Sequence, residues 1–295
     1  MNASTSQAPI TPSDEPSLLP GVNVLIEGPT GTGKTHSLGT LADAGLDVFY
    51  LFTESGMETT LGYWTDRGLS VPPNVHWHVL PRSAGSFATL AASAQQINSL
   101  DFQALTKMQD SARGKHNEYV TLLKALSDFP DDRTGKRFGA VDSWGPDRCL
   151  CLDSLSGINP IVLSLVVGGK PVKNQGEWGI AMDQIEKLLR QLTDGCKCHF
   201  VLTAHVEREV DQVLGGAKLT VSTLGVKLAP KIPPMFSDVI LTARMGDKFT
   251  WSTANSQADL KARNLPIAND LPQDFTQILS KWKSRGGRFT PKVKT

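Results

Sequence analysis

The stretch "GPTGTGKT", residues 28–35, has the residue types and spacing of a phosphate-binding loop. It matches the pattern G-x-x-x-x-G-K-[ST], in which glycines let backbone N–H groups turn inward and wrap phosphate oxygens. In this pattern Lys34 contacts the β- and γ-phosphates, and the Thr35 hydroxyl ligates Mg²⁺. We therefore expect ATP and Mg²⁺ as cofactors, bound by Gly28, Pro29, Thr30, Gly31, Thr32, Gly33, Lys34 and Thr35.

The segments on either side supply the context that such a loop requires. "GVNVLIEG" before it reads as a strand, and "KTHSLGTLADAG" after it reads as a helix whose positive N-terminal end favours phosphate. The alternative is a glycine-rich turn without a ligand. The strand, loop and helix in this order favour the phosphate-binding interpretation.

Two carboxylates end strand-like runs and could complete the chemistry. Asp153 follows the buried run "CLCL", the position from which a carboxylate holds Mg²⁺ through water; the alternative is that it caps a turn. Glu54 ends "DVFYLFTE", and in a parallel sheet that end faces the nucleotide, so we expect Glu54 to act as base toward water. The alternative is a surface carboxylate. Its rival Glu27 lies just before the loop and is expected to point away.

A polar residue also ends the run "CHFVLTAH", at His205. A histidine there could contact the γ-phosphate and report hydrolysis to the loop that follows. A histidine satisfied by local hydrogen bonds at a strand end is the alternative.

Strand-like and helix-like stretches alternate along the chain. Short continuous apolar strands between helices predict an α/β fold with a mostly parallel sheet covered by helices on both faces. "NVHWHVLP" is a further expected strand, and expected helices include "SFATLAASAQQINSL", "EYVTLLKAL" and the amphipathic "EWGIAMDQIEKLLRQLTDG". "CLCLDSLSGI" reads as a buried strand. "SDVILTARMGDKFTWSTA" predicts a C-terminal β-hairpin that turns at Met245–Lys248.

Composition bounds the class of protein. The chain has 295 residues and a formal net charge of +1, yet its last fifteen residues carry six Lys or Arg and no acid. A basic tail on an acidic body suggests a polyanionic partner, although solvated basic tails are common. No apolar run is long enough to span a bilayer, so we expect a cytoplasmic protein, in a bacterium or a phage-infected host, without a membrane partner.

The four cysteines form two C-x-C pairs, Cys149/Cys151 and Cys196/Cys198. Alternation along a strand would put both sulfurs of a pair on one face of the sheet. Buried reduced cysteines are the favoured interpretation, and a four-thiolate zinc site is the alternative.

The order of these features resembles the RecA/Rad51 core: the loop, a glutamate ending the next strand, "LDSLSG", a long amphipathic helix, and a strand ending in a polar residue. Through "LTAHVE", "LGVKLAPKIPPMFSDVILTAR" and "KAR", the chain is similar to short phage-encoded RecA-like ATPases of single-strand annealing and recombination. The resemblance covers roughly residues 20–270 and implies a RecA-like P-loop ATPase core. His205 departs from it, because RecA proteins commonly have Asn or Gln there.

The resemblance also implies two loops that reach single-stranded DNA. Here they are residues 157–176 and 207–234, which hold glycines and cations suited to contacts with a phosphate backbone. Solvent-exposed loop cations without a ligand are the alternative. The candidate DNA-binding residues are Lys170, Lys173, Arg208, Lys218, Lys227 and Lys231.

Lys261 and Arg263, in "KAR", stand where related ring ATPases place a pair that enters the neighbouring subunit's nucleotide site. Such cations stabilise the charge that builds on the γ-phosphate during transfer. Two solvent-facing cations are the alternative. If the pair acts in this way, the active site is shared between subunits.

The chain is expected to divide into a disordered lead (1–19), an ATPase core (20–280) with a polar insertion (101–147), and a basic tail (281–295). The expected activity is DNA-stimulated ATP hydrolysis in strand annealing or recombination. Expected partners are single-stranded DNA, further copies in a ring or filament, and a single-strand-binding protein. The alternatives are a ring-forming DNA motor or helicase-like ATPase, and a nucleotide switch that binds a protein.

Overall fold

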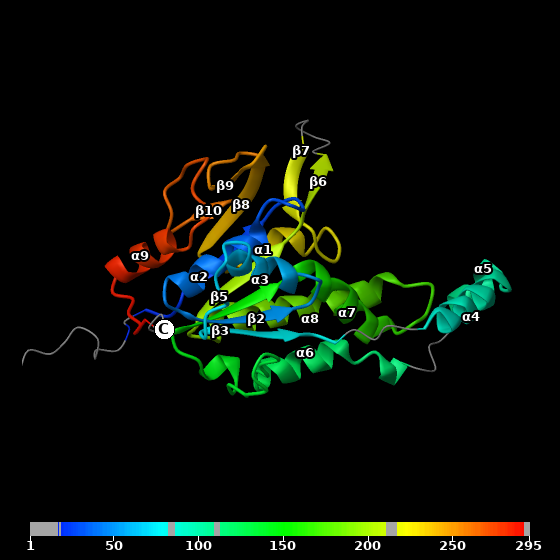
Figure 1. Ribbon diagram of the computed structural model, residues 1–295. Helices are drawn as coiled ribbons and strands as arrows, with labels where there is room; N and C mark the ends of the chain where they lie inside the picture. Colours follow the sequence, from blue (N-terminus) through cyan, green and yellow to red (C-terminus); the bar gives the residue numbers. More distant parts are fainter. Residues whose placement is uncertain (1–16, 18, 82–85, 109–112, 211–216, 292–295) are drawn as a thin grey trace, which may run out of the picture.

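The computed structural model describes residues 17, 19–81, 86–108, 113–210 and 217–291 (Figure 1). Most of the predicted lead, the end of the basic tail and residues 211–216 of the second predicted loop lie outside this part. Within it, a sheet of eight strands has the order β10-β8-β1-β5-β4-β2-β3, with β9 paired to β8. The strands are β1 (Asn23–Glu27), β2 (Asp47–Phe52), β3 (Val75–Val79), β4 (Arg148–Asp153), β5 (His199–Ala204), β8 (Asp238–Met245), β9 (Lys248–Ser252) and β10 (Lys261–Ala262).

The strands of the sheet are mostly parallel. From β3 through β2, β4, β5 and β1 to β8, each strand pairs in parallel with the next, and β5 lies between the strand that precedes the phosphate loop and the strand that ends in Asp153. Every residue of β2 and β5 is buried, as expected for parallel strands covered on both faces. The prediction of a mostly parallel α/β fold is confirmed.

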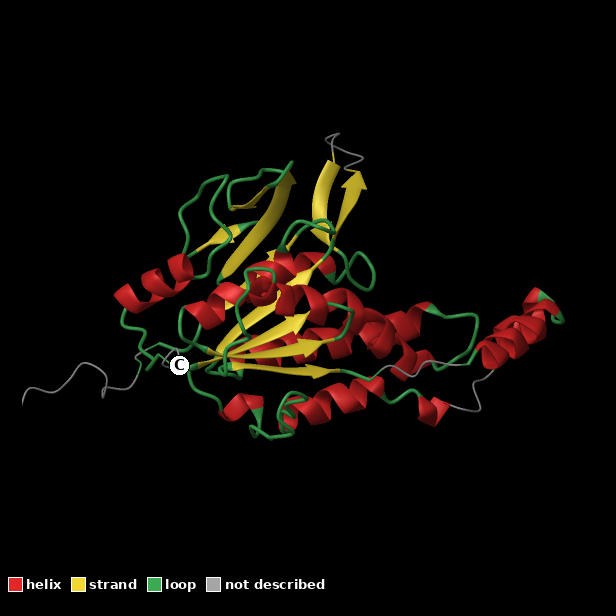
Figure 2. Cartoon of the chain, viewed as in Figure 1, coloured by secondary structure: helices red, strands yellow, loops and turns green. Residues whose placement is uncertain are grey.

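Helices lie on both faces of the sheet (Figure 2). The α-helices are α1 (Lys34–Ser37), α2 (Gly39–Asp43), α3 (Met57–Thr65), α4 (Phe87–Asn98), α5 (Phe102–Lys107), α6 (Glu118–Ser127), α7 (Leu155–Val167), α8 (Gln175–Asp194) and α9 (Thr276–Ser284). Short 3₁₀ helices are η1 (Arg113–Lys115), η2 (Val141–Ser143), η3 (Ala229–Lys231) and η4 (Pro233–Met235). Side chains of α6, α7 and α8 fill the core on one face, and those of α2, α3 and α9 fill the core on the other.

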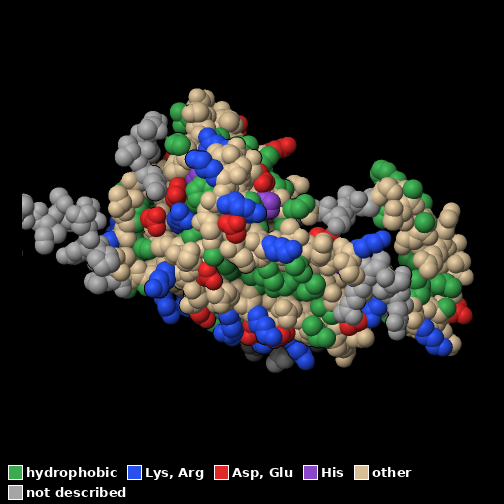
Figure 3. Space-filling model, turned by 90° about the horizontal axis from the view of Figure 1, so that it is seen from below, with side chains coloured by type: hydrophobic (Ala, Val, Ile, Leu, Met, Phe, Trp, Pro, Cys, Tyr) green, Lys and Arg blue, Asp and Glu red, His purple; other side chains and the backbone are tan. Residues whose placement is uncertain are grey.

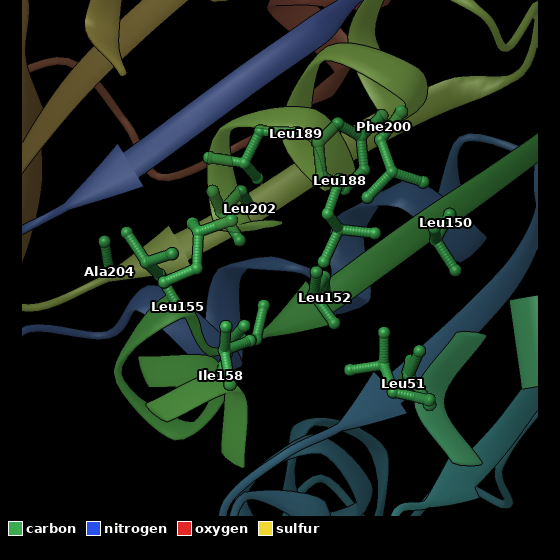
Figure 4. Packing of buried hydrophobic residues seen from close by; sticks show 14 of the residues in the cluster. Leu51, Leu150, Leu152, Leu155, Ile158, Leu188, Leu189, Phe200, Leu202 and Ala204 are labelled. Carbon is green, nitrogen blue, oxygen red and sulfur yellow. The ribbon is translucent and has the colours of Figure 1, made fainter. Parts of the chain in front are cut away.

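The amphipathic helix predicted before "CHFVLTAH" is α8. Its buried leucines Leu188 and Leu189 pack beside Phe200 and Leu202 of β5 (Figure 4). Full burial of one such side chain stabilises the fold by about 1.5–3 kcal/mol. A capping box between Asn174 and Glu177 starts the helix, because it satisfies backbone N–H groups that have no partner within the helix.

Two segments predicted as DNA-contacting loops contain regular structure. Residues 155–167, expected as the end of a strand and the start of a loop, form α7, whose apolar residues lie at helical spacing and pack into the core. Residues 206–221 contain an antiparallel hairpin of β6 (Val206–Val210) and β7 (Ala217–Val221). Both loop predictions were therefore wrong in part, because one stretch buries a helix face and the other pairs with itself.

The predicted C-terminal hairpin is confirmed. β8 and β9 pair from Leu241 with Ser252 to Met245 with Lys248, so the turn lies at the predicted residues. Figure 1 shows β8–β9 and β6–β7 rising from the same edge of the sheet.

Two helices stand away from the body as an arm. The predicted helix at "SFATLAASAQQINSL" is α4, and neither α4 nor the following α5 has a buried residue. Phe87 and Phe102 are 90% and 71% exposed. Figure 1 shows the arm at one end of the molecule, and Figure 3 shows hydrophobic side chains on its surface.

Parts of the predicted insertion and tail belong to the core. In the insertion, α6 contributes Tyr119 and Leu122 to the core, so this segment covers a sheet face. In the tail, Trp282 of α9 is buried and its ring stacks with that of Phe289. Their apolar residues are buried although the surrounding sequence is polar.

The two cysteine pairs are buried in different cores. Cys149 and Cys151 lie on one face of β4 with their sulfurs 3.9 Å apart, as the alternation predicted. Cys196 and Cys198 pack in the core on the other face. Among the described residues no group of three or more His, Cys, Asp and Glu could hold a metal ion, so the four-thiolate alternative is wrong. Nor does any described helix have the length and apolarity needed to cross a membrane.

Candidate nucleotide site

The carboxyl ends of the parallel strands converge on one cavity of about 310 Å³. Its lining combines the phosphate loop, residues 30–36, with Glu54 after β2, Asp153 at the end of β4 and His205 after β5. These residues are far apart in sequence, but parallel strands bring their carboxyl ends to one edge of a sheet. The structure thus brings together the residues that the sequence assigned to nucleotide, metal, water and γ-phosphate.

The loop between β1 and α1 is shaped by glycines and held from outside. Gly33 has φ of 87°, a conformation that residues with a side chain rarely adopt. A side-chain carbon at Gly28 would overlap Thr242 of β8. Thr242 also bonds the Thr32 hydroxyl, with 2.6 Å between the oxygens, and the amide of Gln273 donates to Thr32 O at 2.9 Å. The loop is therefore preformed.

The Lys34 ammonium lies inside this loop. It donates to the carbonyl oxygens of Gly28 at 2.8 Å and Pro29 at 2.7 Å. Burial lowers its pKa to about 8, and the nearby carboxylates of Asp153 and Glu54 oppose that shift. A buried ammonium with a depressed pKa has a strong electrostatic preference for an anionic ligand.

Asp153 is buried and accepts two hydroxyl hydrogen bonds. Thr35 donates to Oδ2 at 2.8 Å, and Thr203 of β5 donates to Oδ1. Burial raises the pKa of Asp153, and the hydrogen bonds from Thr203 and Thr35 oppose it. A divalent cation beside this carboxylate would favour its ionised form.

Glu54 and Glu27 face different spaces. Glu54 lines the nucleotide cavity, and its carboxyl forms no hydrogen bond or ion pair with another described residue. Glu27 lines a separate cavity on the far side of β1, so the prediction that it points away from the nucleotide is confirmed. Glu54 remains the predicted base.

His205 lies beside Lys34 at the nucleotide cavity. Its Nδ1 is 3.5 Å from Lys34 Nζ, and it lines the same cavity as the phosphate loop. The next residue starts β6, so a displacement of His205 would act directly on the β6–β7 hairpin. The sensing role stays a prediction.

The residues of the cavity fit a magnesium nucleotide. Backbone N–H groups of a glycine loop at a helix N-terminus, a buried lysine and a hydroxyl–carboxylate pair are the donors and acceptors that a triphosphate with Mg²⁺ requires. Thr35 and Asp153 would hold the metal ion, and Lys34 with residues 28–35 would hold the phosphates.

The K-A-R segment lies at the opposite edge of the sheet. Lys261 and Arg263 line a cavity of about 380 Å³ with Arg190 and Lys231, beside the amino ends of β1 and β8. Lys261 donates to Phe236 O at 2.6 Å, and burial lowers its pKa. Arg263 is exposed and forms no ion pair with another described residue.

The neighbouring residue Asn264 fixes the position of Arg263. Its backbone N–H and its amide both donate to the buried Asp238 at the start of β8, at 2.7 and 2.6 Å. This clamp holds β10 on the edge of the sheet. Of the two predicted finger cations, only Arg263 is free to reach another molecule.

The six candidate DNA-binding cations divide into two groups. Lys170, Lys218 and Lys231 form ion pairs with acids of the same chain, Glu177, Asp259 and Glu186 respectively. Lys173, Arg208 and Lys227 are exposed and pair with no described acid. The two groups come from the same segments, and nothing in the spacing of the sequence separates them.

Three residues that support the site were not predicted from the sequence. Thr203 bonds Asp153, Thr242 contacts the loop at Gly28 and Thr32, and Gln273 reaches the loop from 241 positions away. The position of Thr203, two residues before His205 on a buried strand, could have indicated a polar partner. No local sequence pattern could have predicted the contacts of Thr242 and Gln273 with the phosphate loop.

No protein-family model and no curated protein sequence matches this chain. Among solved structures, the flagellar accessory protein FlaH from Methanocaldococcus jannaschii aligns with a TM-score of 0.33 and 13% identity, over 79% of this chain and 77% of FlaH. An ATPase from the type III secretion system of pathogenic bacteria aligns with a TM-score of 0.39 and 14% identity, over 81% of this chain and 60% of that chain. The mostly parallel α/β fold rests on the strand order and pairing of the chain itself.

Proposed function

We propose that the protein is an ATP-dependent, single-stranded-DNA-binding ATPase of strand annealing or recombination that assembles head to tail. The observation that carries the ATPase part is the meeting of Lys34, the Thr35–Asp153 pair and the unpaired carboxyl of Glu54 in one cavity. Mg²⁺, when bound, supplies charge neutralisation on the phosphates.

Each residue of the cavity has one part in this chemistry. Residues 28–35 bind and orient the triphosphate, and Lys34 supplies a cation at its β- and γ-groups. Glu54 orients water and accepts its proton, because its carboxyl faces the cavity and is not engaged elsewhere. Asp153 and Thr35 position the metal ion.

The position of Arg263 supports a site shared between subunits. Arg263 and the phosphate loop lie at opposite edges of one sheet. In a head-to-tail assembly these edges face each other, so that one subunit supplies the loop and the next supplies the arginine. An arginine at the γ-phosphate stabilises charge that builds during transfer.

The position of the β6–β7 hairpin supports single-stranded DNA as a second ligand besides the nucleotide. It begins directly after His205, and Arg208 on it is exposed and pairs with no acid among the described residues. Lys173, between α7 and α8, and Lys227, after β7, are further exposed cations that pair with no described acid. Proteins bind single-stranded DNA through lysine and arginine side chains that contact successive phosphates of its backbone.

The test is the ATPase rate of the full chain as a function of protein concentration, with and without single-stranded DNA, at several salt concentrations. We expect the specific rate to rise with protein concentration and with DNA, and DNA stimulation to fall steeply with salt. A specific ATPase rate that is independent of both protein concentration and single-stranded DNA would contradict the proposal. ATP-driven unwinding without annealing would favour a ring motor, and DNA-insensitive hydrolysis at low salt would favour a nucleotide switch.

A further inference from the structure

A further cavity lies on the other side of the strand that leads into the phosphate loop. It has a volume of about 210 Å³ and lies between β1, the β6–β7 hairpin and the segment 226–233. It shares no lining residue with the nucleotide cavity. The proposed ATPase chemistry makes no use of it.

The carboxyl of Glu27 forms part of the wall of this cavity. Side chains alternate along β1, so Glu27 lies on the same face as Leu25, which is in the core packed by α7 and α8. Glu27 is only 1% exposed, and its carboxyl forms no hydrogen bond or ion pair with another described residue. Buried carboxyls normally have such a partner, because burial without one is costly.

The rest of the lining is apolar on one side and acidic on the other. Leu219, Val221, Val226, Ala229, Pro230 and Pro233 supply the apolar wall. Glu209 of β6 and Asp259 add carboxylates, and Lys218 of β7 pairs with Asp259 at 2.8 Å. The acids that face the cavity therefore outnumber its single cation.

We propose that this cavity binds an alkyl chain that ends in a guanidinium or ammonium group, of the kind carried by arginine and lysine side chains. The apolar wall matches the alkyl stem, and Glu27 matches the cationic head. A free small molecule and a basic side chain of a second copy share this chemistry. The proposal is independent of ATP hydrolysis.

Other ligand classes fit less well. A divalent metal ion would need several converging oxygen ligands, and no such group exists among the described residues. An anion would meet three carboxyls against one lysine that already has a partner. A neutral alkyl ligand would leave Glu27 buried without a partner.

Thr242 places this cavity in contact with the phosphate loop. Its hydroxyl donates to the backbone oxygen of Glu27 at 3.2 Å and also bonds the Thr32 hydroxyl. A ligand that displaces Glu27 would therefore also displace Thr242, which supports the phosphate loop.

Ionisation of Glu27 gives the binding a pH dependence. Burial, and then the nearby Asp259 carboxylate, raise the pKa of Glu27 to about 8. At neutral pH the carboxyl is mostly protonated, so a cation must displace a proton to bind. Affinity should rise about tenfold between about pH 7 and about pH 9, while a guanidinium stays charged throughout.

The test is calorimetric titration of the full chain with n-butylguanidinium chloride, with n-butylurea as a neutral probe of nearly the same shape. We expect butylguanidinium to bind at least about fivefold more tightly than butylurea, more tightly still at the higher pH, and with proton release. Glu27→Gln should remove the preference and the pH dependence. Asp142→Asn, at an exposed acid of η2, is the matched control and should change neither.

A second variant tests the proposal even if the Glu27→Gln protein fails to fold. Lys218→Gln removes the internal partner of Asp259, so it should tighten butylguanidinium binding. Equal binding of the two probes to the wild-type chain, or equal butylguanidinium affinity in wild type and Glu27→Gln, would overturn the proposal. So would weaker binding in Lys218→Gln.

Sedimentation velocity with saturating butylguanidinium identifies the source of the natural group. Dissociation of assemblies by butylguanidinium but not by butylurea assigns the group to a second copy. Unchanged assembly together with selective binding assigns it to a separate molecule. Both results support the site, and neither depends on whether the protein hydrolyses ATP.

Discussion

The hydroxyl of Thr35 donates a hydrogen bond of 2.8 Å to Oδ2 of Asp153, a residue 118 positions further along the chain. This bond joins the helix after the phosphate loop to the end of β4. With the bond from Thr203 it holds a buried carboxylate in one orientation, beside a lysine that is also buried. The polar parts of the nucleotide site are thus positioned by one another.

Lys34→Ala should abolish nucleotide binding. The ammonium is the buried cation of the loop, and charge-assisted contacts of this kind would be lost with it, so affinity should fall by about 100-fold or more. Equilibrium titration with a fluorescent ATP analogue measures this. Lys187→Ala, at an exposed lysine of α8, serves as the control, and retained affinity in Lys34→Ala would refute the role of the loop.

Glu54→Gln should bind ATP normally and hydrolyse it about 100- to 1,000-fold more slowly, because an amide cannot accept the proton of water. Separate measurement of nucleotide affinity and single-turnover hydrolysis distinguishes the two steps. Glu58→Gln, at an exposed glutamate on α3, should be close to wild type. Near-normal turnover in Glu54→Gln would place the base elsewhere.

Arg263→Ala subunits mixed with Glu54→Gln subunits should recover part of the activity that each lacks alone. Recovery follows if one subunit supplies Arg263 and its neighbour supplies Glu54. The two residues lie at opposite edges of the sheet, which suggests this arrangement. ATPase rate across mixing ratios is the measurement. Failure to recover at any ratio would count against a shared site.

Lys261→Ala should reduce activity less than Arg263→Ala. Lys261 is bonded to the carbonyl oxygens of Pro234 and Phe236, so its ammonium is engaged within its own chain. An arginine finger typically contributes about 10³ to 10⁵ in rate. Equal losses in the two single variants would show that Lys261 leaves its bonds and acts with Arg263.

Replacing Lys173, Arg208 and Lys227 together by alanine should weaken single-stranded DNA binding more than replacing Lys170, Lys218 and Lys231. The two sets carry the same charge and come from the same segments, but only the second set forms ion pairs within the chain. Each lost phosphate contact should make the slope of log affinity against log salt less negative by about 0.7. Equal slopes for both triple variants would rule out this division.

Acid should destabilise the wild type more than Asp131→Asn. Burial would raise the pKa of Asp131, but hydrogen bonds from Thr134, His76 and two backbone N–H groups outweigh it and hold the pKa below its usual range. A carboxyl with a lowered pKa stabilises the fold above its unfolded pKa, and this contribution is lost as pH falls.

Urea unfolding of wild type and Asp131→Asn between about pH 6 and about pH 3 measures this effect. The free energy of unfolding should fall more steeply in wild type, and only near the acid end. Asp142→Asn, at an exposed acid, should follow the wild type. Parallel curves for wild type and Asp131→Asn would contradict the assignment.

Much of the secondary structure could be predicted from local sequence patterns. The apolar runs of β2, β4 and β5, the stripe of α8 and the turn of β8–β9 follow from patterns within one element. Prediction failed for α7, where an apolar run continued from strand into helix, and for β6–β7, whose polar residues pair mainly with each other. Short apolar or polar runs do not specify which partner they will have.

By itself, the sequence determined the chemistry available: a glycine loop with Lys34 and Thr35, carboxylates at strand ends, and a parallel sheet to align them. Only the tertiary structure decided which of these groups are free. Among the described residues it left Glu54 and Arg263 without an ion pair, engaged Lys261 and Lys218, and placed Glu27 in a separate cavity. The reason is physical: burial and pairing depend on contacts between residues far apart in the chain, and no local spacing encodes them.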